Sequence, residues 1–456
     1  MSASQRSTLT YQLPKGYKQT EVGVIPEEWQ VLSLSEITEP QRPISYGIVQ
    51  TGPNIANGIR CIRVLDINEG RINKAELITT SRQISDAYRR TILKSGDLVM
   101  PLRGKVGDVG LVDEELEGAN LTRGVALVAI RAGWSHVFCQ QVISSSATRK
   151  RLEQTMNGSA LQEIPIASLR AFKIQAPQSL NEQRTIAETL SDVDALLGAL
   201  DRLIAKKRDL KQAAMQQLLT GQTRLPGFAP ANPRFQQTDV GMIPDDWQLT
   251  RIGDVASVSA GGTPSRTVAR YWKGGVPWIT TSQVDFNIVT QADQFISEDG
   301  LKNSPAKLLP PGTLLMALYG QGKTRGKVAT LGISATTNQA CAAISLGGDV
   351  SRDFVFRYLI SQYDFIRNLS NTGNQENLNG VIVKSIPLPL PPTVAEQTAI
   401  AAVLSDMDEE LTALELRRAK TRALKQGMMQ ELLTGRTRLV PANVIERHTE
   451  AKVQIS

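Results

Sequence analysis

The chain has 456 residues, of which 41% are hydrophobic and 21% charged, a composition typical of a globular protein with more than one domain. Its formal net charge of +7 favours a polyanionic partner only weakly. Three cysteines and two histidines, all far apart in the sequence, give no disulfide framework and no cysteine- or histidine-rich metal site, and they argue against histidine-based acid–base catalysis.

The chain begins with an N-terminal segment, residues 1–19, whose first part, Met1–Tyr11, is polar and lacks the apolar core of a signal peptide. The longest apolar runs, such as Leu308–Leu318, contain Pro or Gly and are too short to cross a membrane. We therefore expect a cytoplasmic protein.

A first domain is predicted at residues 20–178, opening with the motif TEVGVIPEEWQ at Thr20–Gln30. Short alternating runs such as Gly124–Ile130 predict strands, so we expect a mixed α+β fold. Basic and amide side chains lie in its loops. Such side chains contact phosphates and bases in DNA, although surface loops are often polar for other reasons. The candidate DNA contacts are Arg103, Lys105, Arg123, Asn157 and Gln162.

Residues 179–224 predict one long helix. Ser179 and Glu182 have the spacing of a capping box, in which the hydroxyl and the carboxylate each accept a free amide, and Gly221 suits a left-handed stop. The basic run Lys206–Arg208 either contacts phosphates or is a solvated face. Apolar residues recur at coiled-coil spacing and form a seam: Ile186, Leu190, Val193, Leu197, Leu200 and Ile204.

A Pro- and Gly-containing linker, residues 225–237, leads to a second domain at residues 238–392. This domain opens with TDVGMIPDDWQ and is also predicted as α+β, with a helix near Asp353–Leu369. Its candidate DNA contacts are Arg266, Thr281, Gln283, Gln321, Lys323, Arg325, Lys327, Asn374 and Gln375.

One segment of this domain, Ala317–Thr324, resembles a relaxed nucleotide-binding Walker A loop. A true loop of this kind needs a helix after it, whereas the residues that follow, from Arg325, predict another strand. We therefore interpret the segment as a β-hairpin and expect no nucleotide there.

Residues 393–439 predict a second long helix, followed by a tail at residues 440–456. Its sequence aligns with that of the first helix without a gap at an offset of 214 residues, and 26 of 45 aligned positions are identical. Two seams of this length need a partner, so we expect the helices to pair antiparallel; packing of each on its own domain is the alternative. The second seam contains Ile400, Leu404, Met407, Leu411 and Leu414.

The repeated entry motif, the LSDxD helices and their LLTGxTRL ends resemble the specificity subunit of type I restriction–modification systems. The GGTPSR motif at Gly261–Arg266 also resembles that family's target recognition domains, and the first domain lacks it. The resemblance covers nearly the whole chain.

This resemblance implies a non-catalytic subunit that binds double-stranded DNA at a bipartite, asymmetric site. Each recognition domain would bind one half-site, and the antiparallel helices would set the spacer and dock two methyltransferase subunits. Motor-nuclease subunits would join them. S-adenosylmethionine, ATP and Mg²⁺ would be used by these partners, and none would be bound by this chain.

Two other classes of protein remain as alternatives. A coiled-coil adaptor that binds only protein explains the helices but not two diverged basic domains. A fused restriction enzyme needs methyltransferase motifs, and neither an Asn/Asp-Pro-Pro-Tyr/Phe motif nor a dinucleotide-binding glycine motif occurs.

Overall fold

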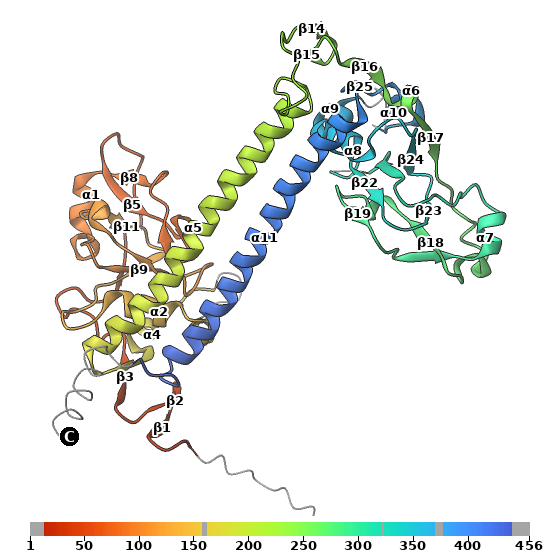
Figure 1. Cartoon of the computed structure of the whole chain (residues 1–456). Helices are drawn as coiled ribbons and strands as arrows, with labels where there is room; N and C mark the ends of the chain where they lie inside the picture. The colour runs from red at the N-terminus through yellow and green to blue at the C-terminus, as the bar shows by residue number, and fades with distance from the viewer. Residues whose placement is uncertain (1–12, 157–161, 321–322, 370–376, 440–456) are drawn as a thin grey trace, which may run out of the picture. The chain divides into compact units, whose positions relative to one another are not determined.

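The computed structural model describes residues 13–156, 162–320, 323–369 and 377–439. The chain forms two compact units: unit 1 comprises residues 1–201 and 416–456, and unit 2 comprises residues 202–415 (Figure 1). Each long helix therefore contributes one part to each unit. Among the helices in the described ranges, none combines the length and apolarity needed to span a bilayer.

Unit 1 is built around a four-stranded sheet, ordered β10-β9-β12-β4, and a three-stranded sheet, ordered β11-β5-β8. Three strand pairs, β1-β2, β3-β13 and β6-β7, complete it. The strands are β1 (Tyr17–Thr20), β2 (Gly23–Pro26), β3 (Trp29–Ser33), β4 (Ser45–Tyr46), β5 (Ile59–Ile62), β6 (Ile67–Asn68), β7 (Arg71–Ile72), β8 (Ile78–Thr80), β9 (Leu98–Pro101), β10 (Gly110–Leu111), β11 (Asn120–Leu121), β12 (Val125–Val128) and β13 (Lys173–Pro177). The shorter helices are α1 (Arg82–Ala87), α2 (His136–Ser144), α3 (Ser146–Glu153) and α4 (Ile166–Ala171).

Unit 2 contains a five-stranded sheet, ordered β17-β24-β21-β22-β19, and a three-stranded sheet, ordered β20-β18-β23. The pairs β14-β15 and β16-β25 complete it. The strands are β14 (Phe235–Thr238), β15 (Gly241–Pro244), β16 (Gln248–Arg251), β17 (Ala256–Ala260), β18 (Val276–Ile279), β19 (Ile288–Val289), β20 (Gln294–Ile296), β21 (Leu314–Ala317), β22 (Val328–Leu331), β23 (Thr336–Thr337), β24 (Cys341–Leu346) and β25 (Pro387–Leu390). The shorter helices are α6 (Ile252–Val255), α7 (Glu298–Lys302), α8 (Arg352–Ser361), α9 (Tyr363–Asn368) and α10 (Gly380–Ser385).

The two diverged domains share one topology. In unit 1 the central strand β5 pairs parallel with β11 and antiparallel with β8. In unit 2 the central strand β18 pairs parallel with β23 and antiparallel with β20. The predicted α+β class is therefore confirmed, and the internal repeat extends through domains whose sequences show it only weakly.

Some predictions of individual elements were confirmed and others were wrong. Strands β21 and β22 pair antiparallel, which confirms the hairpin predicted at the Walker-like segment. The single helix predicted near Asp353–Leu369 was wrong: the backbone of Gln362 leaves the helical region (φ −94°, ψ 12°) and separates α8 from α9. The opening hairpins start at Tyr17 and Phe235, three residues before the predicted domain starts.

The two long helices are α5 (Leu180–Leu218) and α11 (Val394–Leu432). In unit 1 they run antiparallel, because Asp194 pairs with Lys425 at 2.7 Å while Asp201, later in α5, pairs with the earlier Arg418 at 3.1 Å. In unit 2 the same order holds, with Lys207 bound to Glu410 at 2.7 Å. The expected antiparallel pairing is confirmed.

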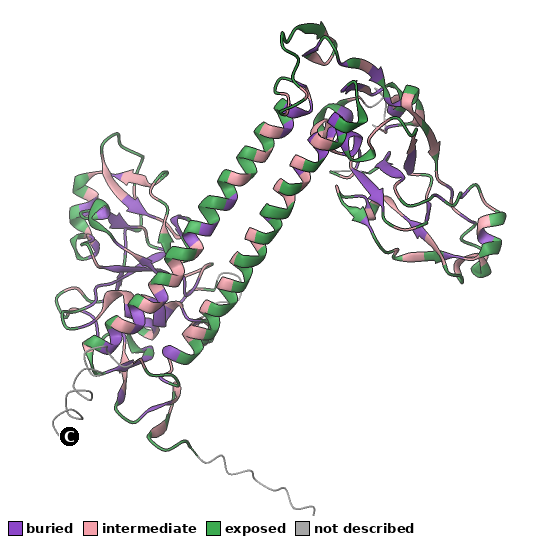
Figure 2. Ribbon diagram, viewed as in Figure 1, coloured by how far each residue is buried: buried purple, intermediate pink, exposed green. Residues whose placement is uncertain are grey.

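The seam residues are shielded from solvent to different degrees, and buried positions recur along both helices (Figure 2). Most seam residues are buried: Ile186, Leu190, Leu200, Ile204, Ile400, Leu404 and Leu411. The others are half-buried: Val193, Leu197, Met407 and Leu414. The charged residues that interrupt the two seams, Lys207 and Arg418, form ion pairs across the helices with Glu410 and Asp201. In the basic run on α5, Arg208 also binds Glu415. Most of the basic run on α5 is thus paired with carboxylates.

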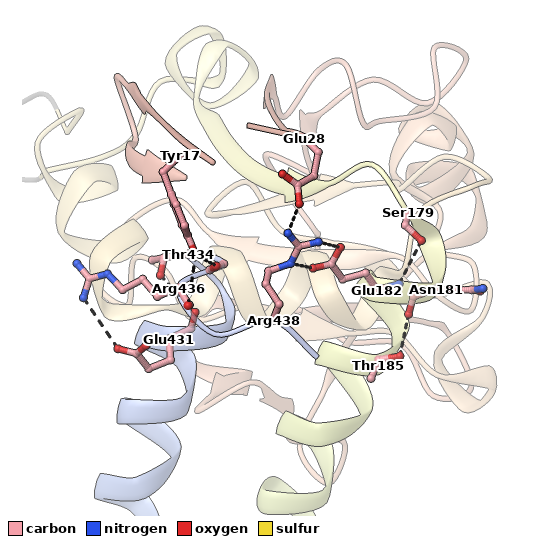
Figure 3. A network of polar contacts seen from close by, with 11 residues as sticks. Tyr17, Glu28, Ser179, Asn181, Glu182, Thr185, Glu431, Thr434, Arg436 and Arg438 are labelled. Carbon is pink, nitrogen blue, oxygen red and sulfur yellow. Dashed lines mark hydrogen bonds and ion pairs between the residues drawn. The ribbon is translucent and has the colours of Figure 1, made fainter. Parts of the chain in front are cut away.

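The end of α11 is fixed to the start of α5 by one arginine (Figure 3). Arg438 donates to both carboxylate oxygens of Glu182, at 2.6 and 2.8 Å, and to Glu28. Ser179 accepts the amide of Glu182 at 3.4 Å, as a capping box requires. For the second half of the predicted box, the hydrogen bonds of these described residues include none from the Ser179 amide to Glu182, whose carboxylate binds the guanidinium of Arg438. We call Arg438, Glu182 and Glu28 the unit 1 junction.

The unit 2 junction repeats this arrangement with the roles of the helices exchanged. Arg224, after α5, binds Glu396 at the start of α11, with one contact of 2.7 Å, and Asp246 at 2.9 Å. Thr393 accepts the amide of Glu396 at 3.2 Å. Burial raises the pKa of Glu396, and the guanidinium of Arg224 opposes that shift. Each junction therefore joins one helix end to the other helix's first turn.

Each hydrophobic core also contains both helices. The unit 1 core holds buried Ile186 and Leu190 from the first turns of α5 together with buried Leu432 from the last turn of α11. The unit 2 core holds Ile400 from the first turns of α11 and Leu218 from the end of α5. The hydrophobic core of each domain is therefore completed by the helix that follows the other domain in the sequence.

Candidate nucleic-acid interface

A tight turn in unit 1, residues 122–124, connects β11 to β12, and we call it turn A. The amide of Val125 donates to the carbonyl of Thr122 at 3.0 Å and closes the turn. Arg123 is exposed at its apex, and its amide donates to the carbonyl of Ile48 at 2.8 Å. The backbone of Arg123 is thus fixed while its side chain reaches solvent.

The loop after β4 holds turn A in place. The amide of Ile48 donates to the carbonyl of Leu121 at 2.6 Å. A Cβ on Gly47 would lie 2.1 Å from that same carbonyl oxygen, so only glycine permits so close a crossing. The next residue, Val49, is 48% exposed beside the turn.

The loop after β9 adds a second arginine. The amide of Leu102 donates to the carbonyl of Gly124 at 2.8 Å. The half-buried side chain of Arg103 lies over the same glycine, with Nε 3.4 Å from where a Cβ would be. The structure therefore brings the predicted residues Arg103 and Arg123 together at turn A.

The remaining candidates of the first domain are placed differently. Lys105 binds its own domain, with Nζ 3.2 Å from the carbonyl of Ile67 and 3.1 Å from Oδ1 of Asn68. Gln162 is exposed, next to the residue that forms a β-bridge with Arg103. Asn157 lies outside the described residues.

Unit 2 has a counterpart of turn A between β23 and β24, residues 338–340, which we call turn B. The amide of Cys341 donates to the carbonyl of Asn338 at 3.1 Å. Gln339 is exposed at the apex, and its Oε1 accepts a hydrogen bond from the hydroxyl of Thr263. The turn is closed as in unit 1, but its apex carries an amide in place of a guanidinium.

The loop that holds turn B is the GGTPSR motif. A Cβ on Gly261 would lie 2.2 Å from the carbonyl oxygen of Asn338, and the amide of Gly262 donates to Thr337 at 2.8 Å. Gly261 therefore does for turn B what Gly47 does for turn A. The first domain lacks the GGTPSR sequence but has the same glycine crossing at its turn.

The predicted contact Arg266 ends that motif and is exposed. Its guanidinium lies 3.5 Å from the ring centroid of Trp272, and its Nη2 donates to Oε1 of Gln294 at 2.9 Å. Stacking on an indole and a neutral hydrogen bond orient the cation without neutralising it. Arg266 is therefore a preorganised positive charge at the surface of unit 2.

Other candidates in the second domain have partners inside it. Gln283 donates to the carbonyl of Gln291 at 3.1 Å, and Lys327 pairs with Asp285 at 2.5 Å. Arg325 is only 7% exposed. A side chain that water hardly reaches cannot contact DNA from the surface, so Arg325 is withdrawn as a candidate.

Of the remaining candidate DNA contacts in the second domain, two are described by the structure and three lie outside the described residues. Lys323 is exposed on the loop after β21, and Thr281 is half-buried. Gln321, Asn374 and Gln375 lie outside the described residues.

Sequence reasoning missed three residues around turn B. They are Gln339, Thr263 and Tyr319, of which Tyr319 is 41% exposed next to Leu318, whose amide donates to Ala340 at 2.8 Å. The segments around β9 and β21 align weakly in sequence, and extending that alignment to the next strand connection places Gln339 opposite Arg123.

Side chains that could bind a metal ion are dispersed over the described ranges. No group of three or more His, Cys, Asp or Glu side chains gathers among these residues where an ion could bind. The three thiols are buried, and burial raises the pKa of Cys61 to about 11 and the pKa of Cys139 and Cys341 to about 12. Such thiols remain protonated and unreactive near neutral pH.

A family model described as the type I restriction modification DNA specificity domain matches the chain twice, over residues 26–206 and 244–421. The chain belongs to this family of DNA specificity subunits. The two matches together cover most of the chain, and each includes one recognition domain with part of its helix.

Individual relatives agree with the family assignment. The chain is 30% identical over 181 residues to the MjaIX specificity subunit of Methanocaldococcus jannaschii, covering 38% of this chain and 41% of the relative. It is 27% identical to the EcoBI specificity subunit of Escherichia coli, covering 44% and 43%. These two matches thus span less than half of each relative. The putative MjaX specificity subunit of M. jannaschii aligns over 94% of this chain and 99% of its own length at 24% identity.

Solved structures show the same fold. The S subunit of a type I restriction–modification system from M. genitalium superposes with a TM-score of 0.54 at 14% identity, covering 89% of this chain and 96% of that one. A chain from a study of the assembly of the type I system superposes with a TM-score of 0.57 at 18% identity, covering 90% and 99%.

Proposed function

We propose that this chain gives a type I restriction–modification complex its sequence specificity by binding a bipartite, asymmetric DNA site. The domain at residues 20–178 binds one half-site and the domain at residues 238–392 binds the other. One observation carries the proposal: the same turn, held by the same glycine crossing, presents Arg123 in one domain and Gln339 in the other. Two equal scaffolds with different apical side chains suit two different half-sites.

The candidate DNA contacts lie at turns A and B and in neighbouring loops of each unit. In unit 1 they are Arg103, Arg123 and Gln162, and in unit 2 they are Arg266, Lys323 and Gln339. Arginine and lysine supply phosphate contacts, while arginine and glutamine also supply paired donors and acceptors for base edges. Because bound DNA lies in the cytoplasm of a prokaryotic cell, we place the chain there.

The helices α5 and α11 set the gap between the half-sites and dock two methyltransferase subunits. Motor-nuclease subunits complete the complex. The methyltransferases use S-adenosylmethionine to methylate adenine, the motor-nuclease uses ATP and Mg²⁺, and this chain binds none of these cofactors.

The test is to co-express the chain with its cognate methyltransferase subunit and to map methylated adenines on a plasmid by long-read sequencing. We expect one split motif with a fixed gap. A complex that forms but methylates no defined motif would favour the alternative function, a coiled-coil adaptor without DNA specificity.

Exchanging one domain sharpens the test. Replacing residues 30–176 with the corresponding domain of another specificity subunit is expected to change one half-site only, because each domain has its own turn and its own core. A change in both half-sites would contradict independent recognition.

Four residues inserted near Ala199, about one helical turn, are expected to lengthen the gap between unchanged half-sites.

A further inference from the structure

We infer that the turn apices determine one base in each half-site: Arg123 recognises a guanine and Gln339 recognises an adenine. This inference rests on the proposed function and adds the base class that each domain selects. It starts from the equivalence of the two positions. Each residue directly follows the residue whose carbonyl closes its turn, and the closing hydrogen bond measures 3.0 Å in turn A and 3.1 Å in turn B.

The framework around each apex is also equivalent. The amide of Leu102 donates to Gly124 in turn A, and the amide of Leu318 donates to Ala340 in turn B, both at 2.8 Å. A glycine crosses directly over the preceding strand in both units. On this shared framework, the apical side chain, Arg123 in turn A and Gln339 in turn B, is the difference that bears most directly on base recognition.

That difference matches the base-edge code of the major groove. The guanidinium of arginine donates two parallel hydrogen bonds, which fit O6 and N7 of guanine. The amide of glutamine donates one hydrogen bond and accepts one, which fits N7 and N6 of adenine. Both side chains are exposed, so neither must break a buried contact to reach a base.

The neighbouring residues support the assignment. In turn B the Thr263 hydroxyl donates to Oε1 of Gln339, and in this arrangement Nε2 points its donors away from Thr263 and can donate to adenine N7. The second lone pair of Oε1 stays available for adenine N6. In turn A the corresponding loop position is Val49, which has no donor, and a guanidinium needs none because all its hydrogen-bonding groups are donors.

The experiment uses the complex of the full chain with its methyltransferase. The wild-type motif is mapped first, and then the motifs of Arg123→Gln and Gln339→Arg are mapped in the same way. Binding is measured with duplexes that carry the wild-type motif or single base-pair changes. We expect Arg123→Gln to change preference at one guanine of one half-site and Gln339→Arg at one adenine of the other. Each change should alter discrimination by about 5-fold to about 150-fold.

Two further variants separate base recognition from a phosphate contact. Arg123→Lys keeps the charge but replaces the planar, paired donors by a single flexible ammonium, so it should weaken guanine preference while binding remains. Arg131→Gln removes an exposed arginine beyond the other end of β12 and should leave the motif unchanged. Uniformly weaker binding by Arg123→Gln, with all base preferences intact, would overturn the inference in favour of a phosphate contact.

The proposed function and the base assignments can be refuted separately. A wild-type complex without any defined motif would refute the proposed function. A wild-type complex with a split motif that Arg123→Gln and Gln339→Arg both leave unchanged would refute only the assignment of these bases.

Discussion

In both junctions an arginine binds two carboxylates, but the two junctions are not equally buried. In unit 2 the side chains of Arg224 and Glu396 are 7% and 1% exposed, whereas in unit 1 those of Arg438 and Glu182 are 36% and 10% exposed. Arg224 also lies 5.7 Å from the ring centroid of Trp247. Similar hydrogen bonds can therefore contribute differently to the free energy of unfolding, because water can replace a lost partner only where it has access.

Turns A and B differ from each other in chemistry and not in burial: their backbones match and both apical side chains are exposed, but one is an arginine and the other a glutamine. A junction arginine joins the end of one helix to the first turn of the other, so removing it leaves the buried glutamate of that first turn without its partner. An apical residue contacts solvent and can be replaced at little cost in stability. The chain has kept its repeat where side chains are mutually dependent and has diverged where they are exposed.

The largest predicted effect comes from breaking the buried junction. Arg224→Ala leaves the Glu396 carboxylate unpaired in a dry site and should cost roughly 3–5 kcal/mol, whereas Arg438→Ala should cost roughly 1–2 kcal/mol. Hydrogen exchange measured on peptides from α5 and α11 would report each unit separately. Arg202→Ala, an exposed position on α5, is the matched control. Equal losses at the two junctions would show that burial does not set their strength.

The second prediction concerns the helix ends, where the units are expected to respond alike. Gly221 and Gly435 both have φ +71°, and an added Cβ would lie 2.5 Å from Pro244 Cγ and 2.6 Å from Pro26 Cγ respectively. Gly221→Ala and Gly435→Ala should each cost about 1–3 kcal/mol.

Urea unfolding would measure these two variants. The control is Gly427→Ala on α11, where a Cβ meets nothing within 4 Å, and it should be neutral or slightly stabilising. A loss for Gly427→Ala as large as for the helix-end variants would mean that the close contacts with proline are not the cause.

Short-range features were predictable from the sequence. The long helices, the capping hydroxyls and the glycine stops follow from residues within a few positions of one another, and the hairpin at Ala317–Thr324 follows from two adjacent apolar runs. Long-range partners were not predictable in this way. The capping-box spacing gave no sign that Glu182 would bind Arg438, 256 residues away.

The candidate interface shows the same limit. Loop composition selected Arg103 and Arg123, which meet at turn A, but it also selected Arg325, which is buried. It missed Gln339, since an isolated glutamine carries no signal until the strands around it are aligned with those of the first domain. Exposure depends on tertiary packing, which the order of residues in a loop does not reveal.

The smallest predicted effect tests a difference between two corresponding carboxylates on the helices. Asp408 pairs with two cations, Lys211 and Arg357, whereas Asp194 pairs with Lys425 and accepts a neutral amide from Gln141 at 3.0 Å. Asp408→Asn should therefore cost about 1 kcal/mol and Asp194→Asn about half as much.

Thermal unfolding at low and high salt would check this difference. The gap between the variants should narrow as salt screens these partly exposed pairs. A gap that persists in high salt would instead indicate that hydrogen-bond geometry, including the bond between Arg357 and Ser405 at 3.1 Å, sets the difference. In that case α8 is held to α11 by oriented contacts more than by charge, and the two units differ in how each domain is attached to its helix.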